Sequence, residues 1–299
     1  MWLVASVAFS LPACAEDETQ TTSQSDASET SSESTPSPAK LFEPRQFRAD
    51  LDGEIETLNY RLLKPQDFKP NNKYPLVVFL HGAGERGADN TAQLKHGVSN
   101  FCSTKMRTEN PCYVLAPQCP KDQSWADIDW TKTAVTQPEK ASKSLRLVMT
   151  LIDEMLESAS VDRRRVYLTG LSMGGFGTWD ALARRPGFFA AAIPVCGGGD
   201  LATAPKIANV PIWCFHGAKD RVVTVELSRK MIEAIKQSGG EPKYIEYPDA
   251  GHDSWTATYS SDEVLQWMFA QRLKAGTGSS PNGPATEENT SEQPEMKKK

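Results

Sequence analysis

Serine, aspartate and histidine, the residue types of a nucleophilic triad, occur in that order along the chain, each after an apolar run. Ser172 lies in GLSMGG, Asp220 ends FHGAKD, and His252 ends YPDAGH. A serine hydroxyl is a weak nucleophile until a base removes its proton, and histidine is the side chain best suited to that near neutral pH. With a carboxylate to orient the histidine, the pattern predicts acyl transfer through a covalent acyl-enzyme.

The glycines around Ser172 have a mechanical purpose. A nucleophile at the apex of a strand-to-helix turn has strained backbone geometry, and side chains at Gly170 and Gly174 would collide with the incoming helix. The free N–H groups at the start of that helix favour a developing negative charge. GLSMGG therefore suits both a tight turn and the mount of a nucleophile.

A tetrahedral intermediate needs two preorganised hydrogen-bond donors for its oxyanion. One is predicted to be the backbone N–H of Met173, directly after the serine. The other is predicted in the Gly-rich turn after Leu80, with Ala83 as first choice and Gly82 or Gly84 as alternatives.

Four histidines compete for the part of the base. His81 lies in the Gly-rich turn, where an imidazole would brace the backbone. His96 is next to Gly97 with no evident partner, and His216 at a strand end is expected to pack or to hold the acid loop. His252 follows the last strand and completes the serine and aspartate pattern, so it is the predicted base, and activity should fall at acidic pH as it becomes protonated.

The orienting carboxylate must lie between the serine and the histidine in chain order for this architecture. Asp220 is preferred because a short loop lifts it from the strand at 211–216. Asp200 at the neighbouring strand end is the alternative, whereas Asp249 and Asp253 share the loop of His252 and would need a cramped turn to reach it.

Apolar runs and amphipathic segments alternate along the chain, which predicts an α/β fold with a doubly wound, mostly parallel sheet. Residues 45–63 should form an N-terminal antiparallel hairpin around Asp52-Gly53. Further strands are expected at 74–80, 113–116, 166–169, 190–196, 211–216 and 244–247, and helices at about 173–184, 225–238 and 261–274. In such sheets ligands bind beyond the carboxyl ends of the strands, where the three triad residues fall.

One more helix is expected from a start signal at Thr136-Gln137-Pro138-Glu139, a capping box with proline at the first helical position. The apolar residues that follow recur at the spacing of a single helix face: Leu145, Val148, Met149, Ile152, Met155 and Leu156.

The two ends of the chain have a different composition from the region between them. Residues 16–40 and 275–299 are rich in serine, threonine, glutamate and proline, with little to bury, so a disordered linker and a disordered tail are predicted around one catalytic domain at 41–274. The formal charge of −5 arises from these two segments. No concentrated basic surface remains to bind nucleic acid.

Residues 1–15 form an apolar stretch too short to span a bilayer and resemble the later part of a bacterial export signal. Leu11-Pro12-Ala13-Cys14 is similar to a lipoprotein processing box, in which Cys14 would be lipidated and tether the protein to a membrane. Ordinary cleavage after Ala15 is the alternative. Either process predicts an exported protein, in the periplasm, on a membrane or secreted.

Five cysteines follow Cys14. An oxidising compartment permits disulfides, but an odd number leaves at least one thiol free. Cys196 and Cys214 end apolar runs and are expected to be buried thiols, while Cys112 and Cys119 could form a bridge. No Cys-x-x-Cys pair or histidine–cysteine cluster predicts a metal site.

The residues that select the substrate are less specific in sequence. Trp125 and Trp130 lie on a loop after the strand at 113–116, at the catalytic end of the sheet, and Trp255 is three residues beyond His252. These indoles could wall a pocket for an aromatic acyl group or a sugar, and ordinary surface packing is the alternative.

Four blocks resemble the α/β-hydrolase superfamily: YPLVVFLHGAGERG, TGLSMGGFGTWD, FHGAKDRVV and YPDAGHDSW. They are similar to bacterial carboxylesterases related to dienelactone hydrolases, to polyhydroxybutyrate-depolymerase and feruloyl-esterase types, and to the catalytic domain of prolyl oligopeptidases, over roughly residues 56–274. The resemblance implies Ser172 as nucleophile, Asp220 as acid, His252 as base, and Met173 with Ala83 as oxyanion donors. It implies no cofactor.

The predicted function is therefore hydrolysis of a small-molecule carboxylic ester, with an aromatic or carbohydrate-linked portion. A serine peptidase acting on short peptides is one alternative, although a prolyl oligopeptidase also carries a β-propeller for which this chain has no room. Two further alternatives are a binding module that has lost its catalytic activity and an enzyme that transfers the acyl group to an alcohol. The sequence predicts no oligomeric state.

Overall fold

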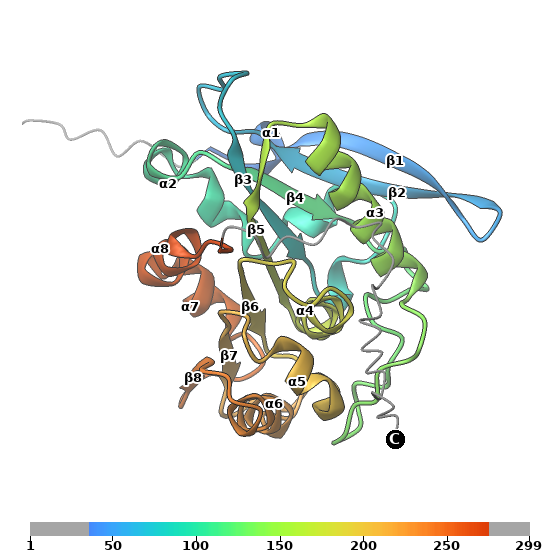
Figure 1. Ribbon diagram of the computed structural model, residues 1–299, viewed down its shortest axis with the longest axis vertical. Coiled ribbons are helices and arrows are strands. Elements are labelled where there is room, and N and C mark those ends of the chain that lie inside the picture. Colours follow the sequence, from blue (N-terminus) through green and yellow to red (C-terminus); the bar gives the residue numbers. More distant parts are fainter. Residues whose placement is uncertain (1–35, 275–299) are drawn as a thin grey trace, which may run out of the picture. The chain divides into compact units, whose positions relative to one another are not determined.

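A computed structural model describes residues 36–274, which contain one eight-stranded sheet with helices on both of its faces (Figure 1). The spatial order of the strands is β1-β2-β4-β3-β5-β6-β7-β8. Their bounds are Glu43–Leu51 for β1, Glu54–Leu63 for β2, Tyr74–Leu80 for β3, Tyr113–Pro117 for β4, Val161–Leu171 for β5, Ala191–Val195 for β6, Trp213–Gly217 for β7 and Lys243–Tyr247 for β8. Every predicted strand is present.

The first two strands form the expected antiparallel hairpin. β1 pairs with β2 from Glu43–Leu62 to Leu51–Glu54, and the turn between them has Asp52 at φ 64° and Gly53 at φ 88°. Two successive residues with positive φ are typical of a two-residue hairpin turn, for which Asp-Gly is a favoured sequence. β2 then pairs antiparallel with β4, while the strands from β4 to β8 are parallel. The predicted fold class is thus confirmed.

Helices cover the two faces of the sheet in two separate sets (Figure 1). Side chains of α3, α4, α5 and α6 join one buried cluster with the sheet, and those of α2, α7 and α8 join the cluster on the other face. The helices are α1 Pro38–Leu41, α2 Thr104–Glu109, α3 Lys143–Ser158, α4 Met173–Arg184, α5 Ala204–Ile207, α6 Glu226–Gln237, α7 Trp255–Ser260 and α8 Asp262–Ala270, and short 3-10 turns are Ala83–Glu85, Ala92–Leu94, Val98–Cys102 and Leu201–Thr203.

The central strands are continuous apolar runs because helices bury both of their faces. All seven residues of β3 are buried, as are all five of β6 and of β7. A rigid sheet of this kind fixes the points at which its strands end. Since β3 and β5 to β8 are parallel, their carboxyl ends lie along one edge, and the loops there hold the predicted triad.

The predicted start of a helix at Thr136 is wrong, because the corresponding helix, α3, begins at Lys143. Its N-cap is Ser142, whose hydroxyl accepts a hydrogen bond from the Leu145 N–H. The Gln137 N–H, which the capping box assigned to the helix, donates instead to Asp200 Oδ2 at 2.8 Å. Tertiary contacts therefore hold this segment as a loop, although the predicted apolar face of the helix is buried except for the half-buried Met149.

The cysteines of the described residues are all buried and free: Cys102, Cys112, Cys119, Cys196 and Cys214. The bridge considered between Cys112 and Cys119 is therefore absent, and burial raises the pKa of Cys112 to about 12 and that of Cys119 to about 11. The expectation that Cys196 and Cys214 are buried thiols is confirmed.

The predictions for residues 1–15, for Cys14 and for the tail at 275–299 concern residues outside 36–274 and remain predictions. Most of the predicted linker also lies outside, although α1 already begins at Pro38. Between residues 36 and 274, none of the helices combines the length and the apolar character needed to cross a bilayer.

Candidate active site

Ser172 lies at the turn between β5 and α4, in a backbone conformation that few side chains adopt. Its φ is 53° and its ψ is −117°, which for a residue other than glycine is a strained geometry. The surrounding glycines permit it. A Cβ atom at Gly174 would lie 1.9 Å from the Leu80 carbonyl oxygen, and one at Gly170 would lie 2.4 Å from the Gly174 carbonyl oxygen. Only glycine fits at either position.

The three residues predicted to form the triad are brought into contact from three different strand ends. His252 Nε2 is 3.0 Å from Ser172 Oγ, and His252 Nδ1 is 2.7 Å from Asp220 Oδ2. Because the carboxylate can only accept, Nδ1 carries the proton and donates to Asp220, which leaves Nε2 free to accept from the serine hydroxyl. This is the arrangement in which a histidine can act as a general base.

Asp220 is held by four donors, and its side chain is fully buried. Burial by itself would raise the pKa of this carboxyl group. Hydrogen bonds from His216, from His252 and from the backbone N–H groups of Val222 and Val223 outweigh that effect and hold the pKa well below its usual range. The carboxylate is therefore ionised whenever His252 is ready to accept a proton.

His216, expected to pack or to hold the acid loop, does both. Its ring is fully buried, and its Nε2 atom lies 3.2 Å from Asp220 Oδ2 and 3.0 Å from the Val223 carbonyl oxygen. Both partners are acceptors, so Nε2–H donates to them. On its other side, Nδ1 is 2.8 Å from Ser228 Oγ. The histidine thus ties the acid loop to α6.

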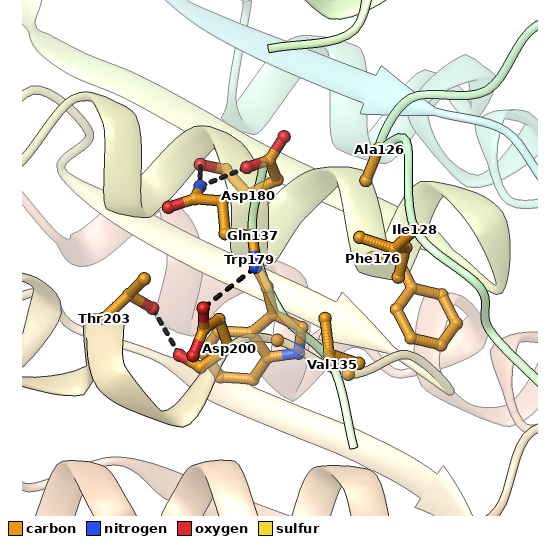
Figure 2. A pocket seen from close by; sticks show the side chains of 11 residues that line it. Ala126, Ile128, Val135, Gln137, Phe176, Trp179, Asp180, Asp200 and Thr203 are labelled. Atoms are coloured by element: carbon orange, nitrogen blue, oxygen red, sulfur yellow. Dashed lines mark hydrogen bonds between the residues drawn. The ribbon is translucent and has the colours of Figure 1, made fainter. Parts of the chain in front are cut away.

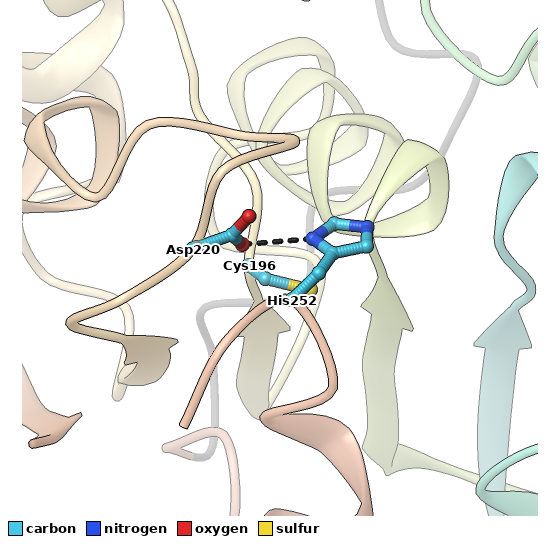
Figure 3. Close-up of side chains that lie close together, drawn as sticks. All are labelled: Cys196, Asp220 and His252. Atoms are coloured by element: carbon cyan, nitrogen blue, oxygen red, sulfur yellow. Dashed lines mark hydrogen bonds and ion pairs between the residues drawn. The ribbon is translucent and has the colours of Figure 1, made fainter. Parts of the chain in front are cut away.

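The Cys196 side chain lies beside the hydrogen-bonded pair of Asp220 and His252 (Figure 3). The Cys196 thiol, an Asp220 oxygen and a His252 nitrogen lie within 4.8 Å of one another. Burial raises the pKa of the thiol well above its usual range, so it stays protonated. Because the His252 nitrogen and the Asp220 oxygen already bond to each other, this group belongs to the Ser172 site, and we assign it no metal.

The Gly-rich turn after β3 lies directly against the nucleophile. A methyl group at Gly82 would be 3.7 Å from Ser172 Cβ. Within residues 36–274, the backbone N–H groups of Ala83 and Met173 make no recorded hydrogen bond to another backbone group. Neither predicted oxyanion donor therefore has a backbone partner among the described residues, and their role stays a prediction.

His81 braces this turn, as its sequence position suggested. Its Nε2 accepts a hydrogen bond of 2.9 Å from the Cys119 N–H, so the proton is on Nδ1, which donates to the Gly82 carbonyl oxygen at 2.6 Å. Burial lowers the pKa of this histidine to about 4. A neutral, fixed imidazole of this kind is a structural part of the turn.

The three tryptophans predicted to wall a pocket differ in what they contact. Trp125 is fully buried and donates from Nε1 to the His81 carbonyl oxygen at 2.9 Å, so it has no surface to offer a substrate. Trp255 packs edge-on against His252, with ring centroids 5.2 Å apart. Trp130 is half-buried and packs against a small apolar cluster of Ala126, Phe176, Val223 and Leu227.

A small pocket lies beside this apolar cluster, between α4, the loop after β6 and the loop 126–137 (Figure 2). Its volume is about 10 Å³, close to what one water molecule needs. Asp180 lines it, and burial raises the pKa of that carboxyl group against hydrogen bonds from Gln137 and Arg184. Asp200, the alternative acid, accepts no hydrogen bond from His252, whose Nδ1 donates to Asp220. Asp200 caps the turn Leu201–Thr203 and binds Gln137.

A second, larger cleft of about 230 Å³ adjoins this pocket, with Val135, Gly199 and Asp200 common to both. Its other lining residues include Leu227 of the apolar cluster and the exposed Lys230. Sequence patterns gave no sign of this cleft, because its walls come from two loop segments and a helix that are far apart in the chain.

Comparison with known proteins shows the family to which this fold belongs. The family described as phospholipase/carboxylesterase matches residues 68–261. A crystal structure of a thermostable esterase has 40% sequence identity and a TM-score of 0.72, and the match covers 78% of this chain. A bifunctional acetylxylan esterase/xylanase of Neocallimastix patriciarum is 29% identical over 73% of this chain, and a probable feruloyl esterase C of Aspergillus niger is 23% identical over 69%.

These matches span different shares of the other proteins. The aligned part covers 30% of the Neocallimastix protein, 64% of the thermostable esterase and 71% of the Aspergillus protein. The chain therefore corresponds to less than a third of the first relative and to slightly less than two thirds of the solved esterase.

Proposed function

Because the chain belongs to the phospholipase/carboxylesterase family of α/β-hydrolases, we propose that it hydrolyses carboxylic esters with Ser172 as nucleophile, His252 as base and Asp220 as orienting acid. The observation that carries the proposal is the unbroken line of contacts from Ser172 Oγ to His252 and on to Asp220, at 3.0 and 2.7 Å. A hydroxyl at the strained apex of a turn, aimed at a neutral imidazole nitrogen, has no structural reason to be there.

The reaction proceeds in two halves. As Ser172 Oγ bonds to the ester carbonyl carbon, its proton passes to His252 Nε2, and the N–H groups of Met173 and Ala83 stabilise the oxyanion. When the C–O bond to the alcohol breaks, His252 returns the proton to the departing oxygen. Water then attacks the acyl-enzyme in the same way, which releases the carboxylic acid and restores the serine hydroxyl.

Asp220 supports both halves without exchanging a proton. Its pKa is held well below the usual range, so it remains a carboxylate next to His252 Nδ1–H. A fixed negative charge there keeps the productive tautomer and stabilises the imidazolium that forms in each half.

The acyl portion of the substrate is proposed to occupy the apolar cluster around Phe176 and the adjoining cleft lined by Leu227. Phe176 is one helical turn from Ser172, and Val223 is three residues after the acid Asp220, which favours this surface for the group attached to the reacting carbonyl. A small ester with an apolar or aromatic acyl group fits these walls. Two relatives are an acetylxylan esterase and a probable feruloyl esterase, which supports a carbohydrate-linked ester as substrate.

Export is proposed as well, from the apolar stretch at residues 1–15 and the cysteine at position 14. A lipidated Cys14 would hold the enzyme at a membrane, with the Ser/Thr-rich linker as spacer.

The test replaces Ser172 by alanine and measures hydrolysis of p-nitrophenyl acetate and of a peptide anilide. The wild type should hydrolyse the ester far better than the anilide, and Ser172→Ala should lose at least about a thousandfold in kcat. The exposed Ser99→Ala is the matched control and should keep full activity. Unchanged turnover in Ser172→Ala would refute the mechanism, and a preference for the anilide would favour a peptidase.

A further inference from the structure

Glu85 is a buried carboxylate without a hydrogen-bond donor of its own. It ends the turn Ala83–Glu85, and its side chain is 8% exposed. Within residues 36–274, its carboxylate oxygens accept no hydrogen bond, and His96 Nε2 lies 3.7 Å from Oε1. A buried carboxylate normally has several close donors, because burial without them is costly.

This carboxylate borders the nucleophile. A methyl group placed on Gly82 would lie 3.0 Å from Glu85 Oε2 and 3.7 Å from Ser172 Cβ. The acidic side chain and the serine therefore both lie within 4 Å of the same point beside Gly82. A negative charge at this point repels the oxyanion that forms on the substrate and so destabilises it. The charge is therefore expected to bind another part of the substrate.

Aromatic contacts connect His96 to His252 through Trp255. His96 packs against Trp255, with ring centroids 5.6 Å apart, and Trp255 packs against His252 at 5.2 Å. His252 must protonate the departing alcohol oxygen, so the alcohol portion lies on the His252 side of the serine. The Glu85–His96 pair is connected to that side of the serine through Trp255.

We propose that Glu85 and His96 form a subsite for a hydroxyl group on the alcohol portion of the ester, close to the oxygen that leaves. The inference rests on the proposed function. The hydroxyl donates a hydrogen bond to the Glu85 carboxylate, and its oxygen accepts one from the N–H of the His96 imidazole. A hydroxyl uses both partners and supplies the donor that Glu85 lacks, and esters of polyols and sugars carry such groups. The same charge excludes an alcohol portion that bears a carboxylate.

The test compares three acetate esters that differ only in the alcohol: ethyl acetate, 2-hydroxyethyl acetate and acetoxyacetate. The wild type should have a kcat/KM about tenfold higher for the hydroxyethyl ester than for the ethyl ester, as expected for a hydrogen bond to a charged group. Acetoxyacetate should be the poorest substrate.

Three variants assign the preference to the subsite. Glu85→Met removes the acceptor and should bring the hydroxyethyl-to-ethyl ratio close to one, and Glu85→Gln should improve the relative rate with acetoxyacetate. His96→Phe keeps the ring against Trp255 but removes the nitrogens, and should lower the ratio even if the Glu85 variants fold poorly. The exposed Glu157→Gln on α3 is the matched control and should leave the ratio unchanged.

Equal kcat/KM values for the ethyl and hydroxyethyl esters in the wild type would overturn the subsite, as would a ratio that survives in both Glu85→Met and His96→Phe. Hydrolysis of p-nitrophenyl acetate separates this failure from that of the proposed function. If Ser172→Ala abolishes that hydrolysis while the ratio is one, only the subsite is wrong.

Discussion

At the scale of single residues, the candidate site depends on how Asp220 is held. Two histidines and two backbone N–H groups donate to a side chain that solvent does not reach. Each donor favours the ionised form of the carboxyl group and also restricts its rotation. His216, which bonds to Asp220 and not to Ser172, should therefore influence catalysis without touching the substrate.

Replacing His216 by leucine removes the donor at 3.2 Å from Asp220 Oδ2, so the carboxylate should turn more freely and orient His252 less well. We expect kcat to fall about tenfold with little change in KM, since the loss acts on the transition state. His216→Gln, which can return a donor to that position, should recover part of the rate. Equal kcat in wild type and His216→Leu would show that the contact has no part in catalysis.

The same variant has a consequence for acid stability. Because the folded pKa of Asp220 is lowered, its contribution to the free energy of unfolding is complete above the unfolded pKa and declines as pH falls. His216→Leu weakens that lowering, so the variant should lose less stability than the wild type between pH 5 and pH 3. Urea unfolding at several pH values measures the difference, and a parallel decline in both proteins would contradict the assignment.

The candidate triad residues could be predicted because each follows a strand at the same edge of the sheet. Chain order and residue type were enough for Ser172, Asp220 and His252. The relation between Glu85 and His96 could not be found in this way, because the two residues lie eleven positions apart in loops whose paths depend on tertiary contacts. The burial of Trp125 was missed for the same reason, since its partner is a backbone carbonyl far away in the sequence.

At the scale of elements, the junction of β3, β5 and α4 has no space for side chains at two glycines. Gly174→Ala would place a carbon 1.9 Å from the Leu80 carbonyl oxygen, so either the helix or the strand must move. We expect a loss of more than about 3 kcal/mol in the free energy of unfolding, or failure to fold. Chemical denaturation followed by circular dichroism measures it.

Gly84→Ala is the matched control for stability. An added Cβ there meets nothing within 4 Å, so the change should be within about 0.5 kcal/mol. If Gly174→Ala were as stable as Gly84→Ala, the close packing of α4 against β3 would be refuted.

The true start of α3 gives a second prediction at this scale. Ser142 Oγ accepts from the Leu145 N–H at 3.1 Å and donates to the Trp125 carbonyl oxygen at 2.8 Å. Ser142→Ala should therefore cost about 1–2 kcal/mol of unfolding free energy. Thr136→Ala, at the start signal that the structure does not use, should change it by less than about 0.5 kcal/mol. Thermal or urea unfolding of both variants distinguishes the two starts, and the reverse order would favour a helix beginning at residue 136.

The misplaced helix start illustrates what a local pattern omits. Thr136 and Glu139 satisfy the spacing of a capping box, but Arg184 donates to the carbonyl oxygens of Pro138 and Glu139, and Gln137 bonds to Asp180. These partners lie on α4, more than forty residues away. A local signal is overridden when distant groups satisfy the same backbone atoms in another conformation.

At the scale of the whole described region, the sheet was predictable and its loops were not. Strands buried on both faces are visible as uninterrupted apolar runs, and parallel strands joined by helices allow few arrangements. The loops at the carboxyl edge carry the polar residues and form the cleft, and their conformation depends on contacts that no spacing rule encodes. The sequence therefore predicts the triad, whereas the substrate-binding surface needs the structure.

The central claim is that Ser172 is the nucleophile, and labelling by a fluorophosphonate tests it most directly. The native protein should form one covalent adduct, and peptide mapping should locate it on Ser172. Prior unfolding, or substitution of His252 by glutamine, should abolish the reaction, because the hydroxyl then has no base. Absence of an adduct on the folded, native protein, or an adduct on another serine, would contradict the account.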